Sequence, residues 1–316
     1  MIDVFNNFYK GKRVLVTGHT GFKGSWLSIW LHELGAEIVG VALDPFTERD
    51  NFVLSGIGKK MVADIRADIR DGQKIKEIFA LYQPEIVFHL AAQPLVRLSY
   101  EQPVETYETN VMGTINIMEA IRAIKSVKVG VMVTTDKCYD NNEQLEGYVE
   151  TDPFGGYDPY SSSKGACEIA IQSWRHSFFN PADYGNRHTV SLASVRAGNV
   201  IGGGDWAKDR LIPDCIRALE ATKVIDIRSP KAIRPWEHVL EPLSGYMFLA
   251  QKMWDDPTSY CEGWNFGPEA ESVLTVWEVA TAIIENFGFG ELKDVSNSNA
   301  LHAVSYTHLR AHETGR

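Results

Sequence analysis

The sequence has few cysteines and no long apolar run. Cys138, Cys167, Cys215 and Cys261 are widely scattered and show no metal-ligand spacing, which predicts reduced thiols rather than a zinc site. No apolar run approaches the ~20 residues that span a bilayer. The first residues also lack the basic and apolar stretches of a signal peptide. We therefore expect a cytoplasmic protein with no membrane segment and no metal site.

Positive charge is scarce as well. The chain has 31 Lys and Arg against 41 Asp and Glu, a formal net charge of −10. A protein that binds the nucleic-acid backbone needs clustered Lys and Arg, so this composition argues against a nucleic-acid partner. A small anionic ligand is still compatible, because helix N-termini and a few arginines can hold one locally. At 316 residues the chain fits one large domain or two closely joined ones.

The first half of the chain alternates short apolar runs with helical patterns, which is typical of a parallel α/β sheet. We expect strands at 14–16, 38–43, 86–90, 129–134, 190–195 and 264–266. We expect helices after Gly24, from Asp71, through 111–121, from Tyr160, near 243–253 and around 276–287. The alternation loosens between Val195 and Pro242. The predicted fold is a Rossmann-like, doubly wound parallel sheet with a smaller C-terminal lobe.

A glycine motif follows the first expected strand. Gly18, Gly21 and Gly24 are spaced by two residues each and open a helix, the context that a dinucleotide-binding loop requires. Such glycines allow a tight turn and let backbone N–H groups approach a pyrophosphate. Asp44 ends the second strand about 20 residues later, where a carboxylate accepts the ribose hydroxyls of NAD and repels the extra phosphate of NADP. The alternative is a structural glycine turn with Asp44 as a turn residue.

Tyr160 and Lys164 are four residues apart and so occupy one face of a helix. A phenol titrates near ~10 in water, and we expect the nearby ammonium to lower that pKa toward neutrality. The pair is then a general base that takes a proton from a hydroxyl while a hydride leaves the same carbon. The Tyr-x-x-x-Lys pattern alone is weak evidence for a catalytic pair, because chance often supplies it. Together with a dinucleotide-binding loop it is strong evidence.

Polar residues follow the strand expected at 129–134. Thr135, Asp136 and Lys137 place a hydroxyl, a carboxyl group and an amine in successive positions at the edge where α/β sheets bind ligands. The alternative is a solvated turn.

Small residues also end the strand at 86–90, where backbone can lie against a cofactor. These residues are Leu90, Ala91, Ala92 and Gln93. Ordinary close packing of strand and helix is the alternative here. Asn110 further along fits a cofactor contact or a polar helix face equally well.

Seven segments together carry a specific resemblance. They are 17–27, 89–103, 135–141, 155–165, 194–214, 234–246 and 262–268, including the runs TGHTGFKGSWL, TDKCYDN and GGYDPYSSSKG. On these segments the chain resembles the extended short-chain dehydrogenase/reductases, and within that group the family of CDP-glucose 4,6-dehydratases. The segments stand in order and at the family's spacing from Lys12 to Pro268.

The resemblance implies a redox-neutral lyase in which NAD stays bound as a catalyst. Tyr160 would take the 4-hydroxyl proton of the sugar, Thr135 would bond to that oxygen, and Lys164 would lower the pKa of the phenol and hold the nicotinamide ribose. Asp136 would protonate the departing C6 hydroxyl. Lys137 stands where dTDP-glucose dehydratases carry glutamate and is the candidate base at C5.

The resemblance also implies two sets of binding residues. The NAD set is Gly18, Gly21, Phe22, Gly24, Asp44, Asp68, Ile69, Leu90, Ala91, Ala92, Gln93, Asn110, Tyr160 and Lys164. The set for the substrate, CDP-glucose, is Arg196, Asn199, Asp205, Trp206, Arg210, Arg234, Trp236 and His238. Arginines would hold the diphosphate by charge-assisted bonds and aromatic rings would stack on the base. Taken individually, the two tryptophans are more often core residues.

We expect residues 1–190 to form mainly the NAD-binding domain and 191–303 mainly an interleaved substrate-binding lobe. Family members dimerise through a four-helix bundle, and the corresponding helices begin near Pro103 and Pro159. Their apolar residues exceed what one buried face requires, including Met118, Ile121, Ile169 and Ile171.

The last residues, 304–316, do not resemble the family. They resemble a translated sequencing adaptor, and we expect them to be non-native. His308 and His312 are four apart, but no third ligand accompanies them, so we expect no metal site there.

Alternatives to the dehydratase are an epimerase or another nucleotide-sugar dehydratase, a non-catalytic NAD-binding regulator, and an inactive truncated fragment. Asp136 and Lys137 discriminate against an epimerase, which has no C6 hydroxyl to expel.

Overall fold

The computed structural model describes residues 4–142, 147–221, 223–268 and 273–296. Its main sheet has seven strands in the order β10-β6-β5-β4-β1-β2-β3, and every neighbouring pair is parallel. The strands are β1 Arg13–Thr17, β2 Glu37–Ala42, β3 Ala63–Arg66, β4 Ile86–His89, β5 Val129–Val133, β6 Ser191–Ala197 and β10 Gly263–Phe266. This order is that of a doubly wound sheet, so the predicted fold class is confirmed.

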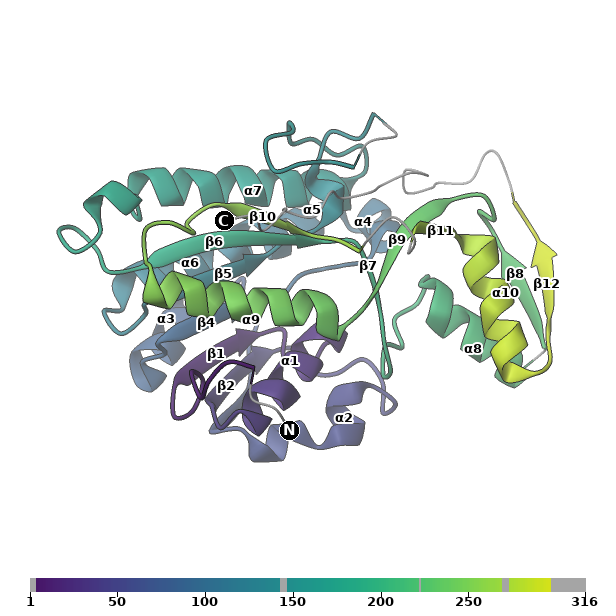
Figure 1. The fold of residues 1–316 in the computed structure, drawn as a ribbon, viewed down its shortest axis with the longest axis horizontal. Coiled ribbons are helices and arrows are strands. Elements are labelled where there is room, and N and C mark those ends of the chain that lie inside the picture. Colours follow the sequence, from purple (N-terminus) through teal and green to yellow (C-terminus); the bar gives the residue numbers. More distant parts are fainter. Residues whose placement is uncertain (1–3, 143–146, 222, 269–272, 297–316) are drawn as a thin grey trace.

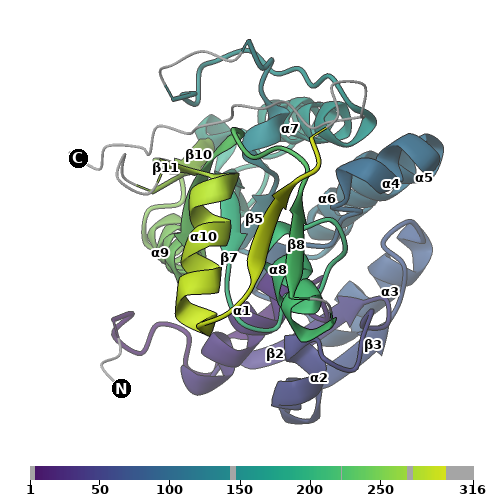
Figure 2. The same ribbon diagram turned by 90° about the vertical axis from the view of Figure 1, so that its right-hand side faces the viewer.

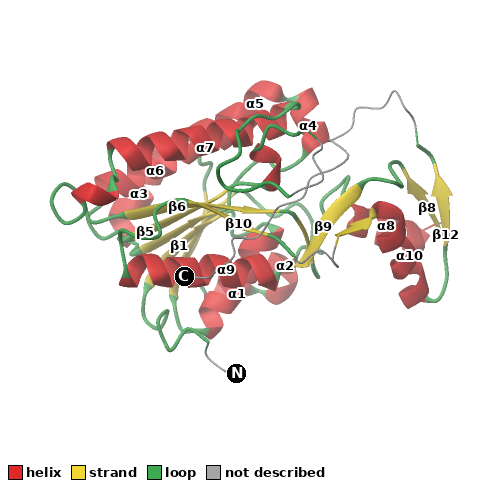
Figure 3. Ribbon diagram, turned by 45° about the horizontal axis from the view of Figure 1, so that its top comes forward, coloured by secondary structure: helices red, strands yellow, loops and turns green. Residues whose placement is uncertain are grey.

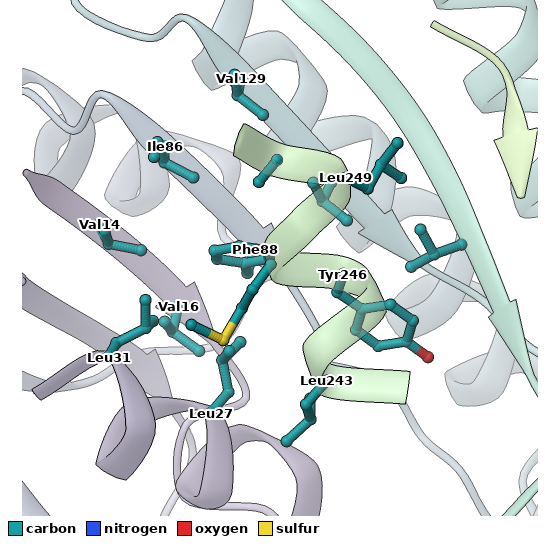
Figure 4. Packing of buried hydrophobic residues seen from close by; sticks show 14 of the residues in the cluster. Val14, Val16, Leu27, Leu31, Ile86, Phe88, Val129, Leu243, Tyr246 and Leu249 are labelled. Atoms are coloured by element: carbon teal, nitrogen blue, oxygen red, sulfur yellow. The ribbon is translucent and has the colours of Figure 1, made fainter. Parts of the chain in front are cut away.

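Helices cover both faces of this sheet (Figure 3). One face packs on α1 (Phe22–Glu33) and α9 (Leu240–Asp255), the other on α3 (Gly72–Tyr82), α6 (Gly113–Ala123) and α7 (Pro159–Ser177). Figure 4 shows side chains of α1 and α9, among them Leu27 and Leu243, gathered over β1, β4 and β5, where Phe88 of β4 meets them. Because both faces are buried, the strands read as continuous apolar runs.

Local signals set where the helices begin. The Asp71 carboxylate accepts a hydrogen bond from the backbone N–H of Lys74 at 2.9 Å, which caps α3. Pro159 is the first residue of α7, and the Asp158 carboxylate before it accepts from the N–H of Ser161 at 2.9 Å. The start of α7 places Tyr160 and Lys164 on its first two turns, beside the end of β5.

The helix expected through 111–121 is longer and interrupted. It consists of α5 (Pro103–Tyr107), a π-helical turn at Glu108–Met112 and α6, and α4 (Val96–Glu101) precedes it. Other short helical segments are α2 (Asn51–Ser55) and 3₁₀ turns at Ile57–Lys60, Asp136–Cys138 and Pro181–Asp183. Helices do begin at Pro103 and Pro159, as predicted.

A smaller lobe stands at the right of Figure 1 and faces the viewer in Figure 2. It contains α8 (Leu211–Ala221), α10 (Val276–Phe287) and the parallel pair β8 (Val224–Ile227) and β12 (Glu291–Asp294). A three-stranded sheet of β11 (Val273–Thr275), β9 (Ile233–His238) and β7 (Asn199–Ile201) joins it to the main sheet. Sequence periodicity missed α8 and the strands β3, β7, β8, β9, β11 and β12. The strands were missed because short, partly buried strands that contain charged residues show little alternation.

The apolar residues offered for a dimer interface have different environments. Met118, Ile121 and Ile171 are fully buried within the chain, whereas Ile169 is 58% exposed. The expectation that these residues exceed one buried face is therefore wrong for three of them: they pack under the sheet between α6 and α7.

Two observations concern the described ranges alone. Within them, no helix is long and apolar enough to cross a membrane. The same ranges contain no group of three or more His, Cys, Asp or Glu that could hold a metal ion. The predicted tail, 304–316, with His308 and His312, lies outside the described residues.

Candidate active site

A cavity of about 750 Å³ lies at the carboxyl edge of the main sheet and extends to the small lobe. Its wall includes residues that follow successive strands: Gly18 after β1, Asp44 after β2, Ala91 after β4, Thr135 after β5 and Gly198 after β6. Parallel sheets bind ligands at this edge, since the strand order reverses there and leaves a crevice.

The glycine loop closes tightly against the end of β4. Gly18 has φ +72°, and a Cβ there would lie 2.7 Å from the backbone nitrogen of Ala91. A Cβ on Gly24 would overlap the carbonyl oxygen of Gly18. Helix α1 begins after Gly21 without a side-chain cap, so its first N–H groups face the cavity. This cradle fits the pyrophosphate of a dinucleotide, as its spacing predicts.

The structure brings most of the predicted NAD residues to this wall. On it lie Gly18, Gly21, Phe22, Gly24, Asp44, Asp68, Ile69, Leu90, Ala91, Ala92, Gln93, Tyr160 and Lys164. Asn110 is not on the wall. It is fully buried, its Oδ1 accepts from the N–H of Gln93 at 2.8 Å, and its Nδ2 donates to Ser163 at 2.9 Å. Asn110 therefore supports the loop that carries Gln93 instead of facing a ligand.

Asp44 is held by a neighbour that sequence reasoning missed. Arg66 Nε donates to Asp44 Oδ1 at 2.9 Å, and the same guanidinium bonds to Asp64. His19 of the glycine loop contacts Asp64 through Nε2 at 2.7 Å. The end of β2, the end of β3 and the glycine loop thus form one polar network.

Four of the five predicted catalytic residues line the cavity: Thr135, Lys137, Tyr160 and Lys164. The fifth, Asp136, is buried next to them, with 1% of its surface exposed. Thr135 Oγ1 donates to Asp136 Oδ1 at 2.8 Å, and Lys137 Nζ is 3.5 Å from the same oxygen. Thr135 also lies near the Tyr160 hydroxyl, where it acts to lower the pKa of the phenol. The hydroxyl, the acid and the amine therefore converge at the end of β5.

The electrostatics of Tyr160 differ from the prediction. Burial raises the pKa of the phenol well above its ordinary value, opposed by Thr135. Lys164 Nζ donates to the carbonyl oxygen of Val133 at 3.5 Å, and the main influences on the pKa of Tyr160 come from other groups. Burial also lowers the pKa of Lys164 itself. The cost of burying the charged phenolate therefore outweighs the stabilisation that Thr135 gives it.

Five of the eight predicted substrate residues line the cavity: Asn199, Asp205, Arg210, Arg234 and Trp236. Arg210 NH1 donates to Asp205 Oδ2 at 2.8 Å, so these two reach the cavity as an ion pair. Trp236 Nε1 donates to the carbonyl oxygen of Leu274 at 3.0 Å, which fixes its ring between β9 and β11.

Arg196, Trp206 and His238 are not on the cavity wall. Arg196 is 3% exposed and bonds to Glu168, because it is the next-to-last residue of β6, between the buried Val195 and Ala197. The Trp206 ring is covered by Arg49, whose guanidinium carbon lies 3.5 Å from the ring centre. His238 Nδ1 accepts from the N–H of Leu240 at 3.3 Å. The resemblance of whole segments did not distinguish these residues from their cavity-facing neighbours.

Sequence reasoning also missed several wall residues. Arg97 of α4 pairs with Asp209 at 3.3 Å, and Arg228 after β8 pairs with the same carboxylate at 2.6 Å. Lys23 lies within the glycine loop and also lines the cavity. Arg97 and Lys23 stand in segments that carry the resemblance, but nothing in the sequence says which way their side chains point.

The fold and the Tyr160–Lys164 pair on its cavity define an extended short-chain dehydrogenase/reductase. The chain belongs to the family described as GDP-mannose 4,6 dehydratase, which it matches over residues 15–303. It is 53% identical to the CDP-glucose 4,6-dehydratase of Salmonella typhimurium over 98% of this chain and 85% of that protein. It is 28% identical to dTDP-glucose 4,6-dehydratase 1 of Escherichia coli over 66% of this chain and 67% of that protein.

Solved structures agree on the fold. A UDP-glucose 4-epimerase of Thermus thermophilus in complex with NAD is 25% identical, with a TM-score of 0.78 over 95% of this chain and 90% of that one. A dTDP-glucose 4,6-dehydratase of Bacillus anthracis in complex with NAD is 20% identical, with a TM-score of 0.75 over 95% of this chain and 88% of that one.

Proposed function

We propose that this chain is an NAD-dependent hydro-lyase that converts CDP-D-glucose to CDP-4-dehydro-6-deoxy-D-glucose and water. The observation that carries the proposal is Asp136 and Lys137 beside the Tyr160–Lys164 pair on one cavity wall, in a chain 53% identical to a CDP-glucose 4,6-dehydratase. A simple dehydrogenase needs the Tyr–Lys pair but has no use for an acid and a base one bond further along the sugar.

The residues fit NAD at the glycine loop. Gly18 and Gly24 let the loop fold tightly on itself and against the end of β4, the backbone shape that would hold a pyrophosphate, and Asp44 follows β2 where ribose hydroxyls are accepted. The 25% identical epimerase was solved with NAD, which supports the same cofactor here. Bound there, NAD supplies a hydride acceptor that becomes the hydride donor within one turnover.

The first step takes place at C4 of the glucose. Tyr160 would take the 4-hydroxyl proton as a phenolate, a form that burial disfavours and that the positive charge of bound NAD would favour, and Thr135 would hold that oxygen by a hydrogen bond. Lys164 lies on the same wall and orients the ribose of the cofactor. Oxidation at C4 makes a ketone, and a ketone acidifies the hydrogen on the neighbouring C5.

The second step removes water across C5 and C6. Lys137, in its neutral form, takes the C5 proton, while Asp136 protonates the C6 hydroxyl as its C–O bond breaks. Lys137 would give its proton back to C5 when the hydride is added at C6. One proton is taken at the 4-hydroxyl and one is given at the 6-hydroxyl, so the cycle is neutral in both electrons and protons.

The small lobe supplies the remaining contacts. Arg210 and Arg234 line the cavity and are placed to hold the diphosphate by charge-assisted bonds, with Trp236 as a stacking surface for the base. We assign residues 1–190 mainly to cofactor binding and 191–303 mainly to substrate binding, with β10 and α9 returning to the main sheet. Products of this type lead to deoxysugars of surface polysaccharides such as lipopolysaccharide.

We also infer a homodimer through the helices α5 to α7. Val104, Tyr107, Met112 and Ile169 are exposed apolar residues on this stretch, which supports a helical interface there. Because its nucleotide ligands are made in the cytoplasm, the cytoplasm is the compartment that we propose. An exclusively monomeric mass at micromolar concentration would contradict the dimer.

Epimerisation is the second candidate, since an epimerase is among the 25% identical structures. A panel of CDP-, dTDP-, GDP- and UDP-glucose, followed by NMR, separates the two. The dehydratase gives a 4-keto-6-deoxy sugar with CDP-glucose as the preferred substrate. Conversion of UDP-glucose to a C4 epimer without loss of water would contradict the proposal.

A further inference from the structure

Lys23 of α1, Glu237 of β9 and Tyr246 of α9 form a polar cluster that interacts electrostatically with Asp136. Glu237 is 7% exposed and Tyr246 is fully buried. Asp136 Oδ2, Glu237 Oε1 and the Tyr246 hydroxyl are buried and have no hydrogen-bond partner among the residues that the structure describes. Lys23 Nζ is 6.0 Å from the centre of the Tyr246 ring. Figure 4 shows this ring at the end of the apolar cluster, with its hydroxyl pointing away from the labelled apolar side chains.

The charges of this cluster act on one another. Burial raises the pKa of Glu237 to about 7, against the attraction of Lys23 and with the repulsion of Asp136 and Glu241. Burial lowers the pKa of Lys23 to about 8, against the attraction of Glu237 and Asp136. Arg210 and Lys164 also repel the Lys23 ammonium. Two carboxyl groups and one amine thus share a site with little water.

A buried carboxylate oxygen without a hydrogen-bond partner costs free energy. Asp136 and Glu237 each have one such oxygen, so a single feature of the site should account for both. Two like charges in such a site keep one proton between them over a wide pH range. A buried water needs two to four polar partners, and the three free oxygens of this cluster offer that many. The cluster can therefore hold one proton that Glu237 and Asp136, the proposed acid, share.

We propose that Glu237 is a positioning residue for the elimination step, which shares one proton with Asp136 through a bridging water and thereby keeps Asp136 protonated. Lys23 stabilises the pair once that proton has been given away. This inference rests on the proposed dehydratase function and assigns a role to two residues outside its catalytic set.

The proton balance closes within the site. Asp136 gives its proton to the C6 hydroxyl, the C–O bond breaks, and the pair is left with two negative charges beside Lys23. The proton that Tyr160 took from the 4-hydroxyl returns to the pair through Thr135, whose Oγ1 lies 2.8 Å from Asp136 Oδ1. No outside proton donor is consumed.

The test compares Glu237→Gln with the matched variant Glu241→Gln, which removes an exposed carboxylate from the first turn of α9. Stopped-flow absorbance of the transient NADH reports C4 oxidation, and rapid quench reports water loss, both at saturating NAD and across pH 6 to 9. Wild-type elimination is expected to fall as pH rises through the titration of the pair, since the proton is then lost.

In Glu237→Gln, Asp136 loses its negative neighbour and gives up its proton more easily. The alkaline limb of the elimination profile is expected to move at least one pH unit lower, with water loss slowed about tenfold at pH 8 and C4 oxidation little changed. Because Glu241 also repels the charge of Glu237, Glu241→Gln should move the limb slightly to lower pH, by clearly less than Glu237→Gln does, and should leave C4 oxidation unchanged. Equal slowing of both steps with an unmoved limb would overturn the inference and leave Glu237 a packing residue.

Lys23→Met is the second variant and keeps the test decisive if Glu237→Gln does not fold. Removal of the cation strengthens proton binding by the pair, so the limb should move to higher pH. A shift to lower pH, or none, would overturn the inference. Failure of the wild type to convert CDP-glucose would instead overturn the proposed function, so the two failures are distinguishable.

Discussion

Arg196 and Glu168 form a buried, two-pronged ion pair under the candidate active site. Arg196 Nε donates to Oε1 at 2.9 Å and NH2 donates to Oε2 at 2.8 Å, with the side chains 3% and 2% exposed. Ser194 Oγ donates to the same carboxylate at 2.7 Å, and Thr134 also bonds to it. The pair therefore fixes β5 at the residue before Thr135, although neither side chain lies on the cavity wall.

Removal of one partner should leave the other as an uncompensated buried charge. Glu168→Ala is expected to lower the free energy of unfolding by about 3–5 kcal/mol, measured by urea denaturation. Asp183→Ala breaks the exposed pair with Arg187 and should cost no more than about 1 kcal/mol. Similar losses in the two variants would show that the buried pair has no special role in stability.

The elimination should depend on Asp136 more than the oxidation does. Asp136→Asn keeps the shape of the side chain but has no proton to give. Water loss is expected to slow by a factor of about 10²–10⁴, the usual contribution of a positioned acid, while C4 oxidation remains measurable. Tyr160→Phe is the comparison variant and should abolish both steps. Equal loss of both steps in Asp136→Asn would remove it from the role of acid.

The cofactor cradle depends on one close approach. A Cβ on Gly24 would overlap the Gly18 carbonyl, whereas a Cβ on Gly203 meets nothing within 4 Å. Gly24→Ala is therefore expected to weaken NAD binding by about tenfold or more, a loss of ~1.4 kcal/mol, as measured by calorimetry. Gly203→Ala should bind NAD as the wild type does. Unchanged affinity in Gly24→Ala would contradict the proposed position of the pyrophosphate.

Stability should fall in acid because of His89. Burial, and to a lesser degree the charge of Lys164, lowers its pKa to about 3, while Thr17 and Thr114 hold its ring at 2.7 and 3.0 Å. The unfolded chain binds the proton near pH ~6.5, so unfolding is favoured as pH falls from there toward 3, by up to about 1.4 kcal/mol per pH unit. In His89→Gln this dependence should be shallower, as urea titrations at several pH values would show. An identical slope would remove His89 as its source.

The sequence predicted the part of the site that lies on regular elements. Thr135, Asp136 and Lys137 follow a strand, and Tyr160 and Lys164 begin a helix, so their meeting at one sheet edge follows from the fold class. The directions of side chains in less regular segments could not be predicted from the fold class. Arg196 lies inside a buried strand, and its neighbours Val195 and Ala197 already indicated burial.

Effects of the surroundings were beyond the sequence as well. The pKa of Tyr160 depends on how deeply the phenol is buried, and spacing to Lys164 cannot show that. Lys23 and Glu237 lie far apart in the sequence and come together only when α1 and β9 take their places in the folded chain. A single sequence carries no sign of such an encounter.

The central claim is that one hydride leaves C4 and returns to C6 of the same sugar. The most direct test is incubation with CDP-glucose that carries deuterium at C4, with catalytic NAD and NMR of the product. We predict a 4-keto-6-deoxy sugar with the deuterium in its C6 methyl group and no accumulation of free NADH. Deuterium recovered in free reduced cofactor, or a product that retains its C6 hydroxyl, would contradict the account.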